Sequence, residues 1–233
     1  MEKSIPNYPY NCIYRPTETT EAANATDGPP LRFPTLYVDP PCEVLQRGGS
    51  RGANLHYNLE SIEWIKSLPI NELLTDDAFV WLWSTNAAVY YLKDITEAWG
   101  LKYRSIFTWC KPRISLGRYL RNSSEQMFLL TKGKPEILYK GQPTWGMYGV
   151  GRHSEKPPEI YAMIERCSPG PYLEMFARTK HKSDRGDWYC WGDEVESDVV
   201  LDDFPVPAYS DNARLFMEKR EKERKKESEA KNA

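Results

Sequence analysis

The residues in this sequence with the clearest chemical potential are Asp39-Pro40-Pro41-Cys42, a carboxylate followed by two prolines and a thiol. They follow an apolar segment, residues 35–38, that is predicted to be a short strand. A carboxylate in this position lies where open α/β sheets bind their ligands. The prolines fix their own φ angles and have no N–H groups. The Asp39 carboxylate and the Pro40 carbonyl are therefore two neighbouring acceptors that can point outward together.

Two adjacent acceptors match the two hydrogens of an exocyclic aromatic amine. The lone pair of such an amine is delocalised into the ring, so the nitrogen is a poor nucleophile. Holding both hydrogens turns the lone pair toward an electrophile, which is catalysis by positioning and electrostatics. This chemistry requires no metal. Taken alone, Asp39-Pro40-Pro41 is also compatible with a strand that simply ends in a proline turn.

Hydrophobic periodicity predicts strands that alternate with helices, which indicates an α/β sandwich with a mainly parallel sheet. One domain is predicted over residues 35–198, after an N-terminal extension over residues 1–34. Residues 199–233 form a charged tail that is predicted to be helical or disordered. Residues 43–58 contain several glycines and are predicted to be a loop. The predicted strands are 35–38, 78–84, 103–110, 126–131, 172–177 and 188–191, and the helices are 61–68, 87–99 and 158–167.

Composition narrows the class of protein. The chain has 233 residues, 40% of them hydrophobic, and five cysteines without a C-x-x-C spacing, so no metal site is predicted. An odd number of cysteines is typical of a reducing compartment. The N-terminus lacks the apolar core of a signal peptide, and no apolar run is long enough to cross a bilayer. We therefore expect a cytoplasmic protein, in the host cytoplasm if it is phage-encoded, with no membrane partner.

Further motifs make the sequence similar to a known family. The chain resembles the MT-A-seventy family of adenine methyltransferases, which includes bacterial and phage DNA enzymes and the catalytic subunit of the eukaryotic messenger-RNA adenosine methyltransferase. The resemblance covers about residues 35–198, with the Asp-Pro-Pro motif before the cofactor segment, which is the permuted motif order. It is carried by residues 36–41, 56–58, 79–84, 108–111, 121–125, 153–157, 161–170, 172–178 and 188–194.

The resemblance implies a Rossmann-like class I methyltransferase fold. It also implies transfer of a methyl group from S-adenosylmethionine to the 6-amino group of adenine in nucleic acid. Asp39 and Pro40 would hold the amine, within the catalytic tetrapeptide that Pro41 and Cys42 complete. The ending at residues 192–198 looks like the bacterial and phage branch, which favours DNA over RNA.

The same resemblance implies a set of cofactor contacts. Lys156 would contact the methionine carboxylate, and Arg178 the ribose or the carboxylate, with Lys180 or His181 beside it. Glu174 would brace that site, and Asn122 would contact the ribose or position its loop. The adenosine part of the cofactor would lie near Asp193, Glu194, Cys12 and Ile13.

One position departs from the family pattern. The family has an aromatic residue after the two prolines, where this chain has Cys42. A ring there stacks on the extruded adenine, and such stacking contributes about 1–3 kcal/mol per base. Three interpretations stay open. In the first, another aromatic side chain, such as Tyr57 or Trp145, stacks on the base. In the second, the enzyme is slow. In the third, the chain is an inactive family member that acts as a nucleic-acid-binding or scaffold subunit.

A basic segment favours nucleic acid as the partner. Residues 102–140 contain nine Lys or Arg against two Glu, which is the pattern expected for phosphate contact. The alternative is a solvated loop balanced by the acidic residues 193–203. No separate target-recognition domain is apparent, so the recognised nucleotide sequence is expected to be short or to depend on a partner. A homodimer or a heterodimer with a related subunit is expected. The predicted substrate contacts are Tyr57, Lys111, Arg113, Arg118 and Arg121.

Overall fold

The computed structural model describes residues 12–13, 32–42, 60–114, 119–151, 155–201 and 204. They belong to two compact units. The larger unit comprises Arg32–Met175 and Lys182–Trp188, and the smaller one takes in the remaining segments, including Phe176–His181. The predictions for Tyr57, for Arg118 and for the loop at 43–58 fall outside the described residues. The predicted boundaries at residues 34 and 198 stay predictions.

The larger unit is built on a mixed, mostly parallel sheet with the strand order β6-β4-β5-β3-β2-β7-β8. Strand β2 runs parallel to β3 and β7, and β4 runs parallel to β6. Strand β5 is antiparallel to both β3 and β4. The bounds are β2 Phe33–Val38, β3 Leu74–Ser84, β4 Lys102–Cys110, β5 Ser124–Lys132, β6 Trp145–Met147, β7 Tyr172–Met175 and β8 Trp188–Trp191, whose first residue lies in this unit.

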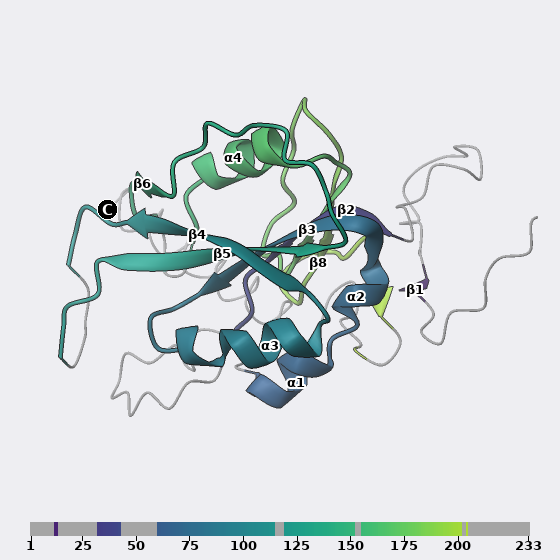
Figure 1. Cartoon of the computed structure of the whole chain (residues 1–233), viewed down its shortest axis with the longest axis horizontal. Helices are drawn as coiled ribbons and strands as arrows, with labels where there is room; N and C mark the ends of the chain where they lie inside the picture. Colours follow the sequence, from purple (N-terminus) through teal and green to yellow (C-terminus); the bar gives the residue numbers. More distant parts are fainter. Residues whose placement is uncertain are drawn as a thin grey trace, which may run out of the picture. The chain divides into compact units, whose positions relative to one another are not determined.

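Helices cover both faces of this sheet (Figure 1). Helix α4 (Glu159–Cys167) lies on one face, where its apolar side packs against Trp81, Trp83 and Phe107. Helices α1 (Ile62–Ser67) and α3 (Leu92–Ala98) lie on the other face, next to the short α2 (Ile70–Leu73). A sheet with helices on both faces confirms the predicted Rossmann-like α/β class.

The strand directions bring several chain segments to one edge of the sheet. Parallel strands β2 and β3 end there at Val38 and Ser84, and β4 ends there at Cys110. Because β5 is antiparallel, it begins at this edge, at Ser124. The residues that follow β2, β3 and β4 and those that precede β5 are therefore neighbours. This is the edge at which α/β sheets bind ligands.

Several details differ from the predicted elements; among them, helix α2 was not predicted, and β3 begins at Leu74, four residues before the predicted start. Residues 87–99 do not form one α-helix, because a 3₁₀ turn (Val89–Tyr91) precedes α3, and the Ala88 and Val89 N–H groups donate to the Thr85 carbonyl. Strand β6 was not predicted, since three residues show no periodicity. Strand β7 ends at Met175, two residues earlier than predicted, because Phe176 has a left-handed φ of 65° and the Ala177 N–H donates to the Trp191 carbonyl.

The other predicted elements are confirmed. Ser61 caps α1, since its hydroxyl accepts from the Trp64 N–H at 3.1 Å. Gly100 follows α3 with a φ of 66°, as expected for a glycine that ends a helix. Strands β4 and β5 run antiparallel because the described part of their connection, residues 111–114 and 119–123, holds no crossover helix.

The smaller unit contains a two-stranded antiparallel sheet. Strand β1 (Cys12–Ile13) pairs with β9 (Val200–Leu201). A small apolar cluster is formed by Ala177, Cys190 and Val195. Over the described residues, no helix has both the length and the apolar character needed to cross a membrane.

Candidate functional site

Asp39 stands directly after β2, and the backbone that follows it is fixed by local hydrogen bonds. The Cys42 N–H donates to the Pro40 carbonyl at 2.8 Å, and the Glu60 N–H donates to the Pro41 carbonyl at 2.8 Å. A carbonyl oxygen has two lone pairs, so the Pro40 oxygen can accept a second hydrogen bond. The Asp39 side chain is 34% exposed, which leaves the carboxylate accessible.

Lys156 is the cation that holds Asp39. Its Nζ lies 2.5 Å from Asp39 Oδ2 and 3.6 Å from Glu125 Oε2. The lysine side chain is only 12% exposed, and its Nζ lies 5.2 Å from the centroid of the Trp83 ring. An ammonium group buried to this extent requires such partners because it has lost most of its water. Its predicted contact with a cofactor carboxylate stays a prediction, whereas here two protein carboxylates surround it.

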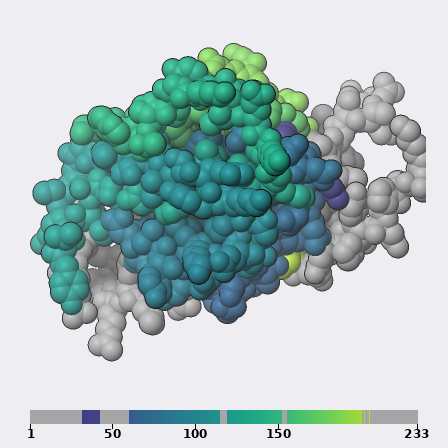
Figure 2. Space-filling model, in the orientation of Figure 1, coloured from purple at the N-terminus to yellow at the C-terminus, as the bar shows by residue number. Residues whose placement is uncertain are grey.

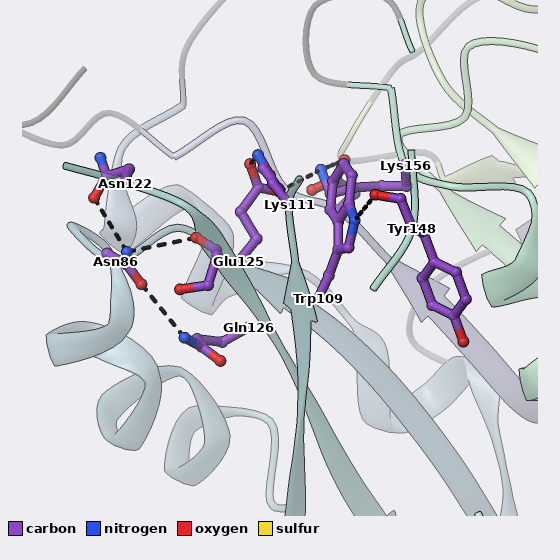
Figure 3. Close-up of polar contacts among 10 residues, drawn as sticks. Asn86, Trp109, Lys111, Asn122, Glu125, Gln126, Tyr148 and Lys156 are labelled. Carbon is purple, nitrogen blue, oxygen red and sulfur yellow. Dashed lines mark hydrogen bonds and ion pairs between the residues drawn. The ribbon is translucent and has the colours of Figure 1, made fainter. Parts of the chain in front are cut away.

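A second lysine extends this network. Lys111, directly after β4, donates to Glu125 Oε1, and its Nζ lies 4.5 Å from the centroid of the Trp109 ring. Figure 3 shows Lys111, Glu125 and Lys156 converging from different strands and loops. Asp39, Lys156, Glu125 and Lys111 thus alternate in sign, and we call them the four-charge chain. Lys111, predicted to bind substrate, is here paired with Glu125.

Glu174 and Tyr161 form a partly buried pair in the same unit. The Tyr161 hydroxyl lies 2.9 and 3.0 Å from the two Glu174 oxygens. Burial raises the pKa of Glu174 to about 8, the Tyr161 hydrogen bond opposes that rise, and the Asp39 charge adds to it. Glu174 is therefore largely protonated at neutral pH.

This pKa shift predicts a pH dependence of stability. The folded carboxyl keeps its proton between its ordinary pKa of 4.5 and about 8, whereas the unfolded one releases it. The contribution of Glu174 to the free energy of unfolding is complete below pH 4.5. It is lost as the pH rises toward 8, by up to about 1.4 kcal/mol per pH unit. Urea unfolding between pH 5 and 8 should give a flatter stability profile for Glu174→Gln than for wild type. The exposed Glu97→Gln should keep the wild-type slope, and a Glu174→Gln profile as steep as wild type would contradict this pKa.

Cys42 is a neutral thiol. Burial, reinforced by the Asp39 charge, raises the pKa of Cys42 to about 12. The thiolate, which is the nucleophilic form of cysteine, is therefore scarce at neutral pH. Cys42 is therefore not expected to act as a nucleophile.

Neutral polar side chains lie beside the four-charge chain (Figure 3). Asn86 Nδ2 donates to Asn122 Oδ1 at 3.2 Å, and Gln126 Nε2 donates to Asn86 Oδ1 at 3.5 Å. Gln126 Oε1 accepts from the Thr108 hydroxyl at 2.8 Å. Asn122, predicted to contact the cofactor ribose or to position its loop, therefore belongs to a network of side-chain amides.

The predicted basic segment divides between the two ends of the sheet. Lys111, Arg113 and Arg121 lie at the Asp39 edge, and both arginines are exposed. The cations within the two strands stand at the opposite end, at the start of β4 (Lys102 and Arg104) or the end of β5 (Lys132), and Lys134 follows two residues after β5. The segment is thus not one continuous phosphate-binding surface.

The smaller unit collects other predicted cofactor residues. Arg178 Nε lies 3.0 Å from Glu194 Oε2, and Lys180 Nζ lies 2.6 Å from Asp198 Oδ1. Burial raises the pKa of Asp193. His181 is half-buried, and Cys12 and Ile13 form strand β1.

The chemistry of these groups fits S-adenosylmethionine. The cofactor has a carboxylate, an ammonium group, ribose hydroxyls and an adenine ring. Arg178 supplies a bidentate donor for a carboxylate, and Glu194, only 9% exposed, supplies acceptors for hydroxyls or an ammonium group. The buried Trp191 Nε1 also has no hydrogen-bond partner among the described residues. Those residues contain no group of three or more His, Cys, Asp or Glu that could hold a metal ion.

Gly192 is required for the close approach of two backbones in the smaller unit. A Cβ at this position would lie 2.1 Å from the Ala177 carbonyl oxygen and 2.7 Å from the Ala177 nitrogen. We expect Gly192→Ala to destabilise the protein by about 3 kcal/mol, at the upper end for overpacking. Thermal unfolding measures the loss. Gly149→Ala is the matched control, since among the described residues no atom beyond its two chain neighbours lies within 4 Å of its added Cβ. Equal melting temperatures for the two variants would refute this view.

Several residues of the network had no assigned role in the sequence. Glu125 lies within one of the matching motifs, but its contacts with Lys111 and Lys156 depend on the pairing of β4 with β5. Asn86 and Gln126 belong to none of the matching motifs. Their position at strand ends near Asp39 could have drawn attention to them, but only once the strand order was known.

Comparisons with known proteins agree with this arrangement. The sequence model of the MT-A70 (MT-A-seventy) family matches residues 33–194. The chain is 28% identical over 181 residues to the human N(6)-adenosine-methyltransferase catalytic subunit METTL3, covering 73% of this chain and 30% of that protein. It is 29% identical over 172 residues to the Arabidopsis thaliana N(6)-adenosine-methyltransferase MT-A70-like, covering 70% of this chain and 24% of that protein.

A bacterial protein also matches. The type II methyltransferase M.MunI of a Mycoplasma species is 24% identical over 152 residues, covering 64% of each chain. The chain spans less than a third of the length of the human and plant relatives. Because the family model covers well over half of the chain and includes both Asp39 and the residues up to Glu194, the protein belongs to the MT-A70 family.

Proposed function

We propose that this protein transfers a methyl group from S-adenosylmethionine to the 6-amino group of adenine in nucleic acid, with DNA favoured over RNA. The observation that carries the proposal is the four-charge chain. It presents the carboxylate of Asp39 at the end of β2 and pairs it with Lys156 at 2.5 Å. A nearby cation favours the ionised form of a carboxyl group, which is the form that accepts hydrogen bonds from an amine.

The residues of this chain perform the positioning. The Asp39 carboxylate and the Pro40 carbonyl each accept one hydrogen of the adenine amine, so the nitrogen lone pair points away from the two acceptors. The cofactor, when bound, supplies an electrophilic methyl group on a sulfonium. As the new N–C bond forms and the S–C bond breaks, positive charge develops on the nitrogen. The Asp39 carboxylate stabilises that charge and accepts the amine proton that must be released.

Two features support nucleic acid as the substrate. Arg113 and Arg121 are exposed at the same edge of the sheet as Asp39, where they can contact phosphates. The human relative is named an adenosine methyltransferase, and the Mycoplasma relative a type II methyltransferase. The preference for DNA rests on the ending at residues 192–198, which looks like the bacterial and phage branch.

Methyl incorporation tests this proposal. Labelled S-adenosylmethionine would be supplied with four oligonucleotides of one adenine-containing sequence: DNA and RNA, each single- and double-stranded. We expect label in the DNA substrates at a higher kcat/KM than in the RNA substrates. Preference for RNA would overturn the DNA assignment, and no label in any substrate would overturn the enzymatic function.

Cys42 favours a second candidate function, an inactive family member that binds nucleic acid or acts as a scaffold, alone or with a related subunit.

The substitution Cys42→Trp distinguishes a slow enzyme from an inactive one. If the missing ring only slows catalysis, Cys42→Trp should raise kcat/KM about tenfold to a hundredfold, the equivalent of one base stacking on an aromatic. Steady-state kinetics on the best oligonucleotide would show the gain, with Cys110→Trp as a control at a second half-buried thiol. No activity in either wild type or Cys42→Trp, with oligonucleotide binding retained, would support the scaffold function.

A further inference from the structure

Five side chains form a row across the sheet near Asp39. The row begins at Trp145 on the edge strand β6, which is 58% exposed, and continues through Thr108 on β4 and Gln126 on β5 to Asn86 and Asn122. Hydrogen bonds of 2.8, 3.5 and 3.2 Å join its polar members in that order. We call these five residues the amide row.

The strand register places the row on one face of the sheet. Thr108 is the register partner of both Trp145 and Gln126, and side chains of register partners point to the same side. Glu125 precedes Gln126 on β5, so its side chain points to the opposite face, where Lys111 and Lys156 bind it. The amide row and the four-charge chain therefore lie on opposite faces of the same sheet edge.

The row is accessible to a ligand. Asn86 and Asn122 are exposed, and Thr108 and Gln126 are half-buried. In Figure 2, the teal and green atoms of β4 and of the segment that leads to β6 lie at the surface of the face shown. Gln126 uses one lone pair for Thr108 and one hydrogen for Asn86, so a further lone pair and a further hydrogen remain within the described part of the chain.

We propose that the amide row binds the nucleotides that flank the target adenine on a single strand. Side-chain amides of Asn and Gln are suited to base edges, above all to the N6 and N7 groups of adenine. An exposed indole is suited to stack on an unpaired base. Consecutive residues on a β-strand are only about 3.3 Å apart along the chain. A DNA strand whose target base lies at Asp39 can therefore pass over the sheet edge at Glu125 and Gln126 and place its next bases on the amide row.

This inference rests on the proposed function, and it gives the row a role in substrate preference rather than in catalysis. It also assigns Asn122 to nucleotide binding, whereas the resemblance implied that Asn122 contacts the cofactor ribose or positions its loop. If the row binds bases, substitutions in it change the affinity for oligonucleotides and the preference for flanking bases. They leave the affinity for S-adenosylmethionine unchanged.

The test uses the full chain and fluorescein-labelled single-stranded DNA 12-mers that contain one adenine and varied flanking bases. Trp145→Ala should weaken binding about 5- to 100-fold in fluorescence anisotropy, the range for loss of one stacked base. Trp145→Phe, which keeps a ring, should bind within about threefold of wild type. Gln126→Ala should lower the ratio of Kd values between flanking sequences by at least about fivefold, since one bidentate base contact discriminates by that much.

Two comparisons make the outcome decisive. Tyr103→Ala removes another exposed aromatic side chain, at the opposite end of β4, and should leave the oligonucleotide Kd unchanged. Calorimetry with S-adenosylmethionine should give wild-type affinity for Gln126→Ala. The inference would be overturned if Trp145→Ala and Gln126→Ala both kept the wild-type oligonucleotide Kd and the wild-type preference for flanking bases. It would also be overturned if these variants lost only affinity for S-adenosylmethionine. Binding that depends on Trp145 and Gln126 without methyl transfer would instead overturn the proposed function and leave the row in place.

Discussion

Asp39→Asn is expected to lower kcat for methyl transfer by at least about 100-fold, the loss typical of removing one preorganised electrostatic group. The substitution keeps one oxygen acceptor but removes the negative charge that stabilises the developing ammonium. It also replaces the carboxylate oxygen that Lys156 Nζ contacts at 2.5 Å. The amide nitrogen that takes its place is a donor and repels the amine hydrogens.

The measurement is single-turnover methyl transfer at saturating cofactor and oligonucleotide, which isolates the chemical step. The matched control is Asp94→Asn, an exposed carboxylate in the first turn of α3, which should react at the wild-type rate. Oligonucleotide Kd should change only a few-fold, since Asp39 acts on the bound amine. An Asp39→Asn rate above about a tenth of wild type would show that the carboxylate is not the group that activates the amine.

Glu125→Gln is the second substitution with a large expected effect. Glu125 is bound by Lys111 and lies 3.6 Å from Lys156, so neutralising it leaves two half-buried cations to share the single carboxylate of Asp39. Removing one partner of a buried ion pair is costly because the remaining charge is uncompensated. We expect kcat/KM to fall about 10- to 100-fold, with the pair's partial exposure limiting the loss.

The double variant Lys111→Gln/Glu125→Gln tests whether charge balance is the cause. It removes one cation and one anion together and leaves the contact of Asp39 with Lys156 in place. We expect kcat/KM to recover to within about fivefold of wild type, a coupling larger than the error of additivity. Because the two residues act through Lys156, the pH profile of kcat should shift in Glu125→Gln and return in the double variant. Additive losses, with no recovery, would show that Glu125 acts by itself.

The part of the site that could be predicted from sequence is the part that depends on local structure. Residues 35–38 are apolar and are followed by two prolines, so the end of a strand at Asp39 follows from short-range rules. The cap that Ser61 gives to α1 also follows from a short-range rule, since serine is among the residue types preferred at that position. By contrast, Lys156 is 117 residues from Asp39, and its contact with that carboxylate follows from the strand order, not from any local pattern.

The features that the sequence did not reveal have a physical explanation of the same kind. Strand β5 is antiparallel to its neighbours, which reverses the end at which its residues meet the site. This brings Glu125 and Gln126 to the Asp39 edge and leaves Lys132 at the far end. The charge count of residues 102–140 could not reveal that division. Strand β6 is too short for periodicity to detect, so the exposed position of Trp145 opposite Thr108 was not predictable either.

The central claim is that the Asp39 carboxylate presents an adenine amine for methylation. Its most direct test is mass spectrometry of nucleosides released from a single-adenine oligonucleotide after reaction with wild type and with Asp39→Asn. The account predicts N6-methyladenine with wild type and at most about a hundredth of that rate with the variant. A methyl group on any other base or ring position, or an equal yield of N6-methyladenine from Asp39→Asn, would contradict it.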